Sequence, residues 1–551
     1  MDNPPAAHGT TTPPGAPPAT PPRHPRAYEP GVLVLCVVLS LLGSIIGVHL
    51  ITTLGISANT SVIGAVIAMM IGRASFAGLR KFKNPHRQNL LQTAISTSTF
   101  AAANGLLAPI AIPYALGQPE LVWPMLLGCS IGVAVDVFVL FRAFGSRFMP
   151  ASAPWPPGVA SAETIRAGVV GGRRVVILLG GAVVGVAGSL LSLPMSAAGV
   201  ALIGNLWALL MFAFGLLIAQ YTPVLWDIDL SELYVAHGFM IGAGVVALLQ
   251  VAWIIVKSRT TSGKRSEAAR LDEVAKDETL GYTITDAALG RAMSTGYILF
   301  VLGALFIALI GGATSDLSGS GLFGFVLFAG VAAIVHELIV GLAAMHAGWF
   351  PAFAVTLIFL IFGLFLGIPT VPLVILVAYC SATGPAFADM GYDYKAGWIL
   401  RRETRPWREY ELVGRREQLK ASIIAIVVAI GVVAVSWQGL FGDGGIPPSA
   451  TVFAETITAG ISDPDVATTM ALWAIPGAVI QLVGGSTRQM GVLFATGLLV
   501  ATPHAGWLVL IALATRVVWR RLRGPDDTSL SLFGAGIIAG DSVFNVGKVA
   551  Q

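Results

Sequence analysis

Long apolar runs separated by short polar segments dominate the chain from Val32 onwards. Uninterrupted runs of about 20 residues recur, which is the length that an α-helix needs to cross the hydrocarbon core of a bilayer. Composition agrees, because a chain that is 55% hydrophobic and 11% charged, with a mean hydropathy of +0.79, has too little polar surface to cover a soluble globule. We therefore predict an all-α polytopic membrane protein with about 14–16 transmembrane helices.

The polar segments divide the 551-residue chain into a tail, two halves and a linker. Residues 1–29 are rich in Pro, Ala and Thr, so we expect a disordered cytoplasmic tail. A charged linker, residues 257–285, separates an N-terminal transmembrane half, residues 30–256, from a C-terminal transmembrane half, residues 286–551.

Similarities between the halves indicate an internal repeat. Residues 234–242 resemble residues 533–540 with one residue gapped, and Pro156-Pro157-Gly158 is comparable with Ile446-Pro-Pro-Ser449. Pseudo-repeated halves with broken helices in corresponding places are typical of secondary transporters, whose site lies between the halves. We therefore expect re-entrant or broken helices at both proline sites, and we expect the two sites to meet.

Basic residues predict which loops lie in the cytoplasm, because Lys and Arg accumulate on that side of a membrane. The net charge of +4 fits such loops and is no argument for a nucleic-acid partner. Basic residues precede the first apolar run and follow the second and the fourth: Arg23 and Arg26, residues 80–87, and Arg142 with Arg147. The N-terminus is therefore expected in the cytoplasm. In the C-terminal half we expect a helix over residues 370–390 and then a basic loop up to Lys420.

The basic linker should also be cytoplasmic, but the apolar runs visible after Arg174 would leave it outside. One crossing is therefore hidden, or one run is re-entrant. Residues 193–222 are the expected place, because they contain Pro194 and several small residues and are followed by Pro223.

Residues 154–168 differ from the runs around them. Three prolines should hold the first part extended, Gly158 should turn the chain, and a helix rich in small residues should begin near Val159. The free N–H groups at such a helix start would attract a carboxylate or another anion. An interfacial loop that caps a helix is an equally good interpretation of this sequence alone.

The third apolar run, residues 89–116, is unusually polar. It carries Gln92, Thr93 and Asn104 together with four consecutive hydroxyl side chains at residues 96–99. Such groups are costly against lipid, so they should face other helices or water. We expect them to face one central cavity with Gly158, Ser161 and residues 389–395.

Ionisable residues inside apolar runs are candidates for proton coupling, since a proton-driven carrier needs a carboxylate or imidazole that exchanges protons between its open states. For any single residue, a structural role is as good an interpretation; Glu163, for example, can pair with Arg166 three positions on. The candidates carried forward are Glu163, Asp136, His336, Glu337 and Asp541.

Several motifs, in order along the chain, resemble the oligopeptide transporter (OPT) family. Trp155-Pro-Pro-Gly-Val-Ala-Ser-Ala-Glu-Thr-Ile165 resembles its Pro-x-Gly-x-Ala-Thr-Ala-x-x-Ile signature. Ser57-Ala-Asn-Thr-Ser-Val62 and Gln92-Thr93 resemble segments of its second and third helices. Asp389-Met-Gly-Tyr-Asp-Tyr-Lys-Ala-Gly-Trp398 and residues 534–541 resemble two later stretches, although Tyr392 stands where the family has Gln.

This resemblance implies a member of the family, which we interpret as a bacterial protein related to the yellow-stripe-like branch. It implies proton-coupled import of small peptides, or of metal complexes with amino-acid-derived chelators, across the cell membrane; a homo-oligomer is left open. The residues that we expect to bind substrate are Gln92, Thr93, Asn104, Pro157, Gly158, Ser161, Asp389, Tyr392 and Lys395.

Other functions fit the sequence less well. His336-Glu337 begins a zinc-protease motif, but Val340 stands where the second histidine is required. A lone Asp227-Ile-Asp229 is too common to identify a glycosyltransferase, and the three cysteines have no metal-ligand spacing. We therefore expect no enzyme, no cofactor and no bound metal. A channel for a small polar solute is the alternative to a carrier.

Overall fold

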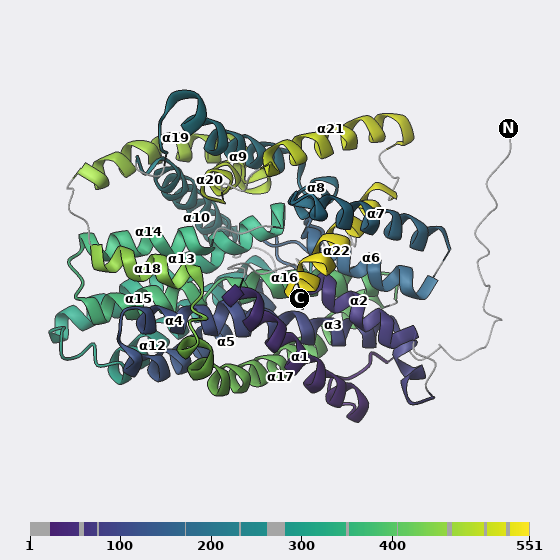
Figure 1. Cartoon of the computed structure of the whole chain (residues 1–551), viewed down its shortest axis with the longest axis horizontal. Helices are drawn as coiled ribbons and strands as arrows, with labels where there is room; N and C mark the ends of the chain where they lie inside the picture. The colour runs from purple at the N-terminus through teal and green to yellow at the C-terminus, as the bar shows by residue number, and fades with distance from the viewer. Residues whose placement is uncertain are drawn as a thin grey trace.

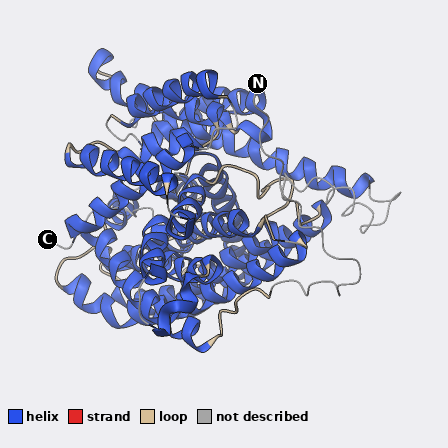
Figure 2. Ribbon diagram, turned by 90° about the vertical axis from the view of Figure 1, so that its right-hand side faces the viewer, coloured by secondary structure: helices blue, strands red, loops and turns tan. Residues whose placement is uncertain are grey.

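The computed structural model describes residues 23–53, 60–73, 77–170, 172–230, 233–261, 282–348, 352–404, 406–459, 465–500, 504–524 and 529–549. All regular structure in these ranges is helical (Figure 2). Most of the predicted linker and residues 57–59 of the second-helix motif lie outside the described residues.

The helices of the N-terminal half begin at Pro30. They are α1 (Pro30–Thr53), α2 (Thr60–Arg73), the 3₁₀-helix η1 (Ala77–Lys83), α3 (Pro85–Phe100), the π-helix η2 (Ala101–Leu107), α4 (Ala108–Ala115), the 3₁₀-helix η3 (Pro119–Leu121), α5 (Val122–Ala143), α6 (Pro156–Val170), α7 (Arg173–Leu190), α8 (Met195–Ile203), α9 (Leu206–Trp226) and α10 (Val235–Thr261).

The helices of the C-terminal half begin at Asp286. They are α12 (Asp286–Ile310), α13 (Gly319–Ala347), α14 (Ala352–Phe365), α15 (Thr370–Ala382), α16 (Pro385–Arg401), α17 (Trp407–Gly442), α18 (Pro448–Ala459), α19 (Asp465–Arg488), α20 (Met490–Val500), α21 (Ala505–Arg523) and α22 (Ser529–Val549).

Nine helical stretches of the described residues are long and apolar enough to cross a membrane, and shorter apolar helices accompany them. This confirms the prediction of an all-α polytopic membrane protein; the exact number of crossings stays a prediction. Two of the stretches, Pro85–Ala115 and Thr370–Arg401, are mostly buried in their apolar part, whereas most of the apolar part of Trp407–Gly442 is not. The first two therefore form the centre of the bundle.

Both central stretches are interrupted. In the first, η2 replaces the regular α-helical turns between α3 and α4. The second breaks between α15 and α16, where Gly384 adopts a φ of +87° that favours glycine. We predicted an unbroken helix over residues 370–390 and a basic loop after it; instead the chain breaks before Pro385 and α16 continues to Arg401.

Helices of the two halves pair reciprocally (Figure 1). α7 packs on α22 and α10 packs on α19, so each half lends its last helix to the other. In the same way, the contact of α8 with α22 corresponds to the contact of α20 with α10. The contact of α6 with α16 corresponds to the contact of α18 with α4. This pattern supports the predicted repeat and makes α6 the counterpart of α18.

The two proline sites nevertheless do not meet, which corrects our expectation. α6 packs mainly on α2, α16 and α22, whereas α18 packs on α4, α14 and α15. Figure 1 shows α6 and α18 near opposite ends of the long axis. Their equivalence therefore comes from the repeat and not from a shared site.

The start of α6 lies deep in the protein. Pro156 and Pro157 form its first turn instead of an extended segment, so the helix begins three residues before the expected Val159. Trp155 is fully buried, and its backbone N–H donates to the Met345 carbonyl at 2.8 Å. From there α6 runs beside α16 to Arg166, whose guanidinium donates to the Ile399 carbonyl at 2.8 Å.

Residues 193–222, where we expected a hidden crossing or a re-entrant run, hold the short helix α8 and most of α9. α8 has nine residues, which span about 14 Å, less than half of a bilayer core of about 30 Å. The end of the linker lies beside the loop after α5, because Thr283 donates its N–H to the Gly145 carbonyl at 2.8 Å. This contact agrees with a linker on the same side of the membrane as that loop.

Close packing of α7 on α22 gives a stability prediction from two adjacent glycines. A Cβ on Gly181 would lie 2.2 Å from the Phe533 carbonyl oxygen, whereas the nearest atom to a Cβ on Gly180 is 4.0 Å away. Gly181→Ala should therefore destabilise the protein by about 1–3 kcal/mol. Gly180→Ala should be neutral or stabilising by up to about 1 kcal/mol, because alanine favours the helix. Thermal unfolding of both variants in the same detergent checks this; equal Tm values would contradict the packing.

Candidate functional site

α16 carries several buried charged side chains: Asp389, Asp393, Lys395 and Arg401. Its side chains from Pro385 to Ile399 are all buried. Polar groups surround it at three levels: a break cluster at its start, a serine–aspartate cluster in its middle and an arginine hub at its end.

The break cluster consists of Asp136 on α5, His336 and Glu337 on α13, and Thr383 and Gly384 between α15 and α16. Asp136 Oδ2 accepts the Gly384 N–H at 2.6 Å, which satisfies one donor at the start of α16. Asp136 and Glu337 are both 0% exposed and interact electrostatically. Among the described residues, no donor reaches Asp136 Oδ1 or either carboxyl oxygen of Glu337.

His336 is held on both ring nitrogens. Nδ1 lies 3.2 Å from Thr383 Oγ1, and Nε2 lies 2.9 Å from the Ala352 carbonyl and 3.1 Å from Thr356 Oγ1. A neutral imidazole satisfies this set by donating from Nε2 and accepting at Nδ1. The ring therefore ties α13 to α14 and to the break, beside Glu337.

The serine–aspartate cluster consists of Ser61, Gln92, Ser96, Thr97, Ser161, Asp389 and Asp393. Asp393 Oδ1 accepts from Ser61 Oγ at 3.1 Å and from Gln92 Nε2. Asp389 Oδ1 accepts from Ser96 Oγ at 2.6 Å. The two aspartates stand four residues apart and therefore share one face of α16. The cluster joins α2, α3, α6 and α16.

Two polar atoms beside this cluster are buried without partners. Asp389 Oδ2 and the Tyr392 hydroxyl accept or donate no hydrogen bond within the described ranges. Each of the two residues is 1% exposed. The Asp389 carboxylate also acts electrostatically on the Tyr392 phenol, so the two groups lie near each other.

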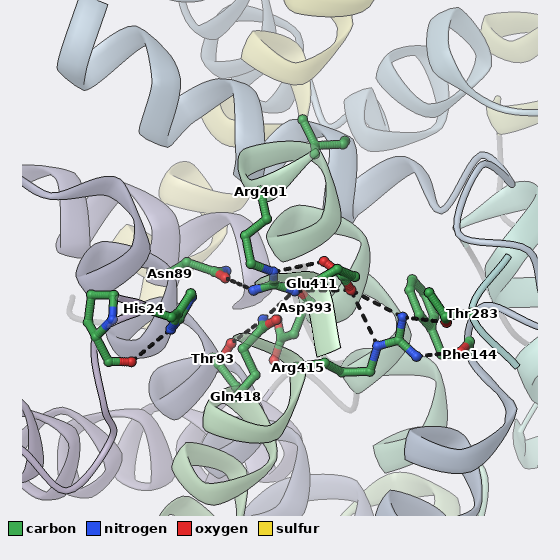
Figure 3. A network of polar contacts seen from close by, with 12 residues as sticks. His24, Asn89, Thr93, Phe144, Thr283, Asp393, Arg401, Glu411, Arg415 and Gln418 are labelled. Carbon is green, nitrogen blue, oxygen red and sulfur yellow. Dashed lines mark hydrogen bonds and ion pairs between the residues drawn. The ribbon is translucent and has the colours of Figure 1, made fainter. Parts of the chain in front are cut away.

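The arginine hub consists of Arg401, Glu411 and Arg415, with Asn89, Thr93 and Gln418 around them (Figure 3). Glu411 bridges the two guanidiniums, at 2.8 Å from Arg401 Nε and 3.1 Å from Arg415 Nη2, and all three side chains are at most 1% exposed. Gln418 connects the hub to the serine–aspartate cluster, because its Nε2 donates to the Asp393 carbonyl at 2.8 Å and to Thr93 Oγ1 at 3.0 Å.

The hub gathers segments that are distant in sequence. Arg415 donates to the Phe144 carbonyl at 2.7 Å and to Thr283 Oγ1 at 3.0 Å, and Glu417 beside it accepts the Ala27 N–H at 2.8 Å. Burial, together with the Arg401 guanidinium, lowers the pKa of His24 to about 3, so this ring packs at the hub in its neutral form. The N-terminal segment, the loop after α5 and the end of the linker therefore share one face.

Gly158 is a packing position, which corrects our expectation of a bare helix start. The N–H groups of Gly158 and Val159 both donate to the Trp155 carbonyl, at 2.9 and 3.2 Å, so they are not free. A Cβ on Gly158 would lie 2.4 Å from the Tyr392 carbonyl oxygen and 2.7 Å from Lys395 Cβ. Gly158 thus lets α6 approach the backbone of α16.

The other predicted substrate residues are divided between the clusters and the packing around them. Gln92, Ser161 and Asp389 meet in the serine–aspartate cluster, and Thr93 lies at the hub. The Pro157 carbonyl accepts from Ser161 Oγ at 2.9 Å, and Asn104 lies half-buried in η2. Lys395 Nζ donates to the Ala151 carbonyl at 2.8 Å, away from the aspartates. Their role in binding substrate stays a prediction.

Two predicted proton carriers have structural partners. Glu163 lies 3.4 Å from Arg166, the pairing that the sequence allowed, and Arg166 also contacts Glu403 at 3.1 Å. Asp541 Oδ1 accepts from Ser189 Oγ at 2.6 Å and Oδ2 from the Ser196 N–H at 3.0 Å, which joins α22 to α7 and α8. The role of Glu163 and Asp541 in proton coupling stays a prediction.

The sequence analysis missed the break and the hub. Gly384-Pro385 inside an apolar run is a turn signal, and it marks the break. Arg401, Glu411 and Arg415 were included in an expected basic loop; only the four-residue spacing of Glu411 and Arg415 hinted at a buried helical pair.

Two acidic neighbours on α17 test the hub. Glu411→Gln leaves two buried guanidiniums without their carboxylate, which should cost about 3–5 kcal/mol of stability. The exposed Glu409 lies two residues earlier, and Glu409→Gln should change stability by less than about 0.5 kcal/mol. Thermal unfolding and gel filtration in detergent measure both; an unchanged Tm for Glu411→Gln would show that the hub contributes nothing.

Comparison with known families bears on the N-terminal half. Residues 31–258 match the family model described as OPT oligopeptide transporter protein. No curated protein matches the chain. The match includes the Trp155–Ile165 motif and Gln92-Thr93, whereas Asp389 and residues 534–541 lie outside it. The predicted resemblance to the oligopeptide transporter family is therefore confirmed over residues 31–258.

Proposed function

We propose that this protein is a proton-coupled importer of small peptides, or of metal complexes with peptide-like chelators, in the cell membrane. Its N-terminus and the arginine hub face the cytoplasm. The basic residues near this face, including Arg87 and Arg147, support that orientation, because cytoplasmic loops are enriched in Lys and Arg.

Transport is supported by the family match, by the break between α15 and α16, and by the π-helical segment η2 in the stretch beside it. Discontinuous helices at the interface of two repeated halves are where secondary transporters bind their substrates and coupling ions. Here α3, η2 and α4 belong to one half and α15 and α16 to the other, and α16 packs on both α3 and η2. Movement of one half against the other would therefore act directly on these elements.

The observation that carries proton coupling is the acid pair of the break cluster. Two fully buried carboxyl groups interact there, and Glu337 receives no hydrogen bond from the described residues. A carboxylate buried without donors is costly, and two of them repel, so this closed arrangement favours a pair that holds a proton.

Release of that proton can be linked to the position of α16. Asp136 accepts the Gly384 N–H at the start of this half-helix. Water that reaches the pair in an open state stabilises the ionised carboxylates, and an ionised Asp136 binds the positive end of the α16 dipole more strongly. Protonation and helix position would then depend on each other.

Uptake into proteoliposomes tests the proposal. A panel of di- to hexapeptides, glutathione and chelated iron under an imposed inward pH gradient should identify a substrate that wild-type protein accumulates. Glu337→Gln should reduce the accumulation ratio to about 1, the value without coupling, while substrate exchange at equal pH continues.

Glu163→Gln is the matched control, because it also removes one carboxylate but from a pair with Arg166. It should still accumulate substrate. If Glu163→Gln loses accumulation and Glu337→Gln keeps it, proton coupling belongs to Glu163 instead. Failure of the wild-type protein to accumulate any member of the panel would contradict the proposed function.

Orientation can be tested with a single exposed cysteine. Cys36, Cys129 and Cys380 are all buried, so the wild-type background should be low. The Arg147 side chain is 60% exposed on the face of the hub. In intact cells Arg147→Cys should react with a membrane-impermeant maleimide only after permeabilisation. Labelling of intact cells would place this face outside.

A further inference from the structure

The serine–aspartate cluster has no part in the proposed proton step, yet it holds two buried carboxyl groups. We propose that this cluster is a binding site for a monovalent cation of the size of sodium, separate from the break cluster. The binding itself is independent of the proposed transport; only its role as a second coupling ion rests on that function.

The first reason is the concentration of negative charge. Asp389 and Asp393 are 1% and 0% exposed and interact electrostatically on one face of α16. Like charges at this spacing on a helix destabilise each other. The nearest buried cation on the same helix, Lys395, donates to the Ala151 carbonyl and lies over the Trp398 ring at 4.5 Å. It therefore does not pair with the aspartates.

The second reason is that hydrogen-bond donors surround the Asp393 carboxyl group. Its Oδ1 accepts from Ser61 Oγ at 3.1 Å and from Gln92 Nε2, and Thr97 Oγ1 lies 3.5 Å from Oδ2. Hydrogen bonds donated to a carboxylate favour its ionised form. These donors offset part of the cost of burying a charge on Asp393, in contrast to Glu337, which has no such donors among the described residues.

The third reason is the unpartnered atom of Asp389. Oδ2 is buried without a hydrogen-bond partner, and so is the nearby Tyr392 hydroxyl. A proton placed on Oδ2 would find no acceptor within the described ranges, whereas a cation coordinates a carboxylate oxygen directly. The combination therefore favours a cation over a proton at this atom.

The ligand chemistry indicates a hard monovalent ion. The cluster offers carboxylate and hydroxyl oxygens, from Asp389, Asp393, Ser61, Ser96 and Thr97, which are the ligands of hard cations. No group of three or more His, Cys, Asp or Glu residues able to hold a metal occurs in the described ranges. Two carboxyl groups are fewer charged ligands than a typical calcium site provides, and the hydroxyls add no charge, so we assign the site to a monovalent ion.

Binding of ²²Na⁺ to the purified full-length protein in nanodiscs, in a choline buffer, tests the site without a transport substrate. Wild-type protein should bind one sodium ion per chain saturably. Asp389→Asn should weaken binding by roughly 10–100-fold, the range seen when a metal site loses a supporting group. Ser96→Ala, which removes one hydroxyl with little change in volume, should weaken it by a smaller factor.

Glu337→Gln is the matched control, since it removes a buried carboxyl from the break cluster and should keep one saturable sodium site. Gel filtration and the Tm of each variant show that it is folded, and Ser96→Ala carries the test if Asp389→Asn does not fold. Absence of saturable binding, or equal affinity in Asp389→Asn and wild type, would overturn the inference. So would loss of binding in Glu337→Gln, which would move the ion to the break cluster.

The two proposals fail in different ways. Proton-driven uptake without sodium binding would refute the cation site alone. Saturable sodium binding without uptake of any peptide or chelate would refute the proposed function alone.

Discussion

Polar groups inside a membrane bundle have little water to bond with, so they must find partners within the protein. This constraint is concentrated on α16, which begins inside the bundle and is buried along nearly its whole length. Asp136 accepts the Gly384 N–H at the start of α16. At the start of α6, the Trp155 carbonyl accepts the N–H groups of Gly158 and Val159. The interrupted backbone at the centre is thus satisfied by protein groups, which allows helices to start at this depth.

The two ends of α16 are held very differently. At the C-terminal end, Arg401 belongs to a buried ion network that also fixes the loop after α5 and the end of the linker. At the N-terminal end, the break at Gly384 separates α16 from α15. The Gly384 N–H donates to Asp136 Oδ2, and Asp136 Oδ1 has no partner among the described residues. An element fixed at one end and held by a titratable group at the other is suited to a small pivoting motion.

The sequence predicted the class of fold because apolar runs of spanning length leave no other arrangement for the backbone. It also singled out Gln92, Asp389 and Ser161, which come together from three helices in the serine–aspartate cluster; their role in binding substrate stays a prediction. The sequence did not predict the role of residues whose environment is set by contacts distant in sequence. Gly158 was read as an open turn because nothing local shows that Tyr392 and Lys395 lie against it. Glu411 was read as part of a loop because its two arginine partners become neighbours only in the folded bundle.

The surroundings of the buried acids also decide what each can bind. Glu337 lies where none of the described donors reaches it, so a proton is the simplest way to remove its charge; Asp393 lies among hydroxyl and amide donors that stabilise its charge. Asp136 and Asp389 stand between these extremes, each with one oxygen bonded and one unpartnered among the described residues. Both contact α16, Asp136 through the backbone of its first turn and Asp389 as part of the helix itself. A ligand at either place that prefers one position of α16 must therefore change the affinity at the other place by the same factor.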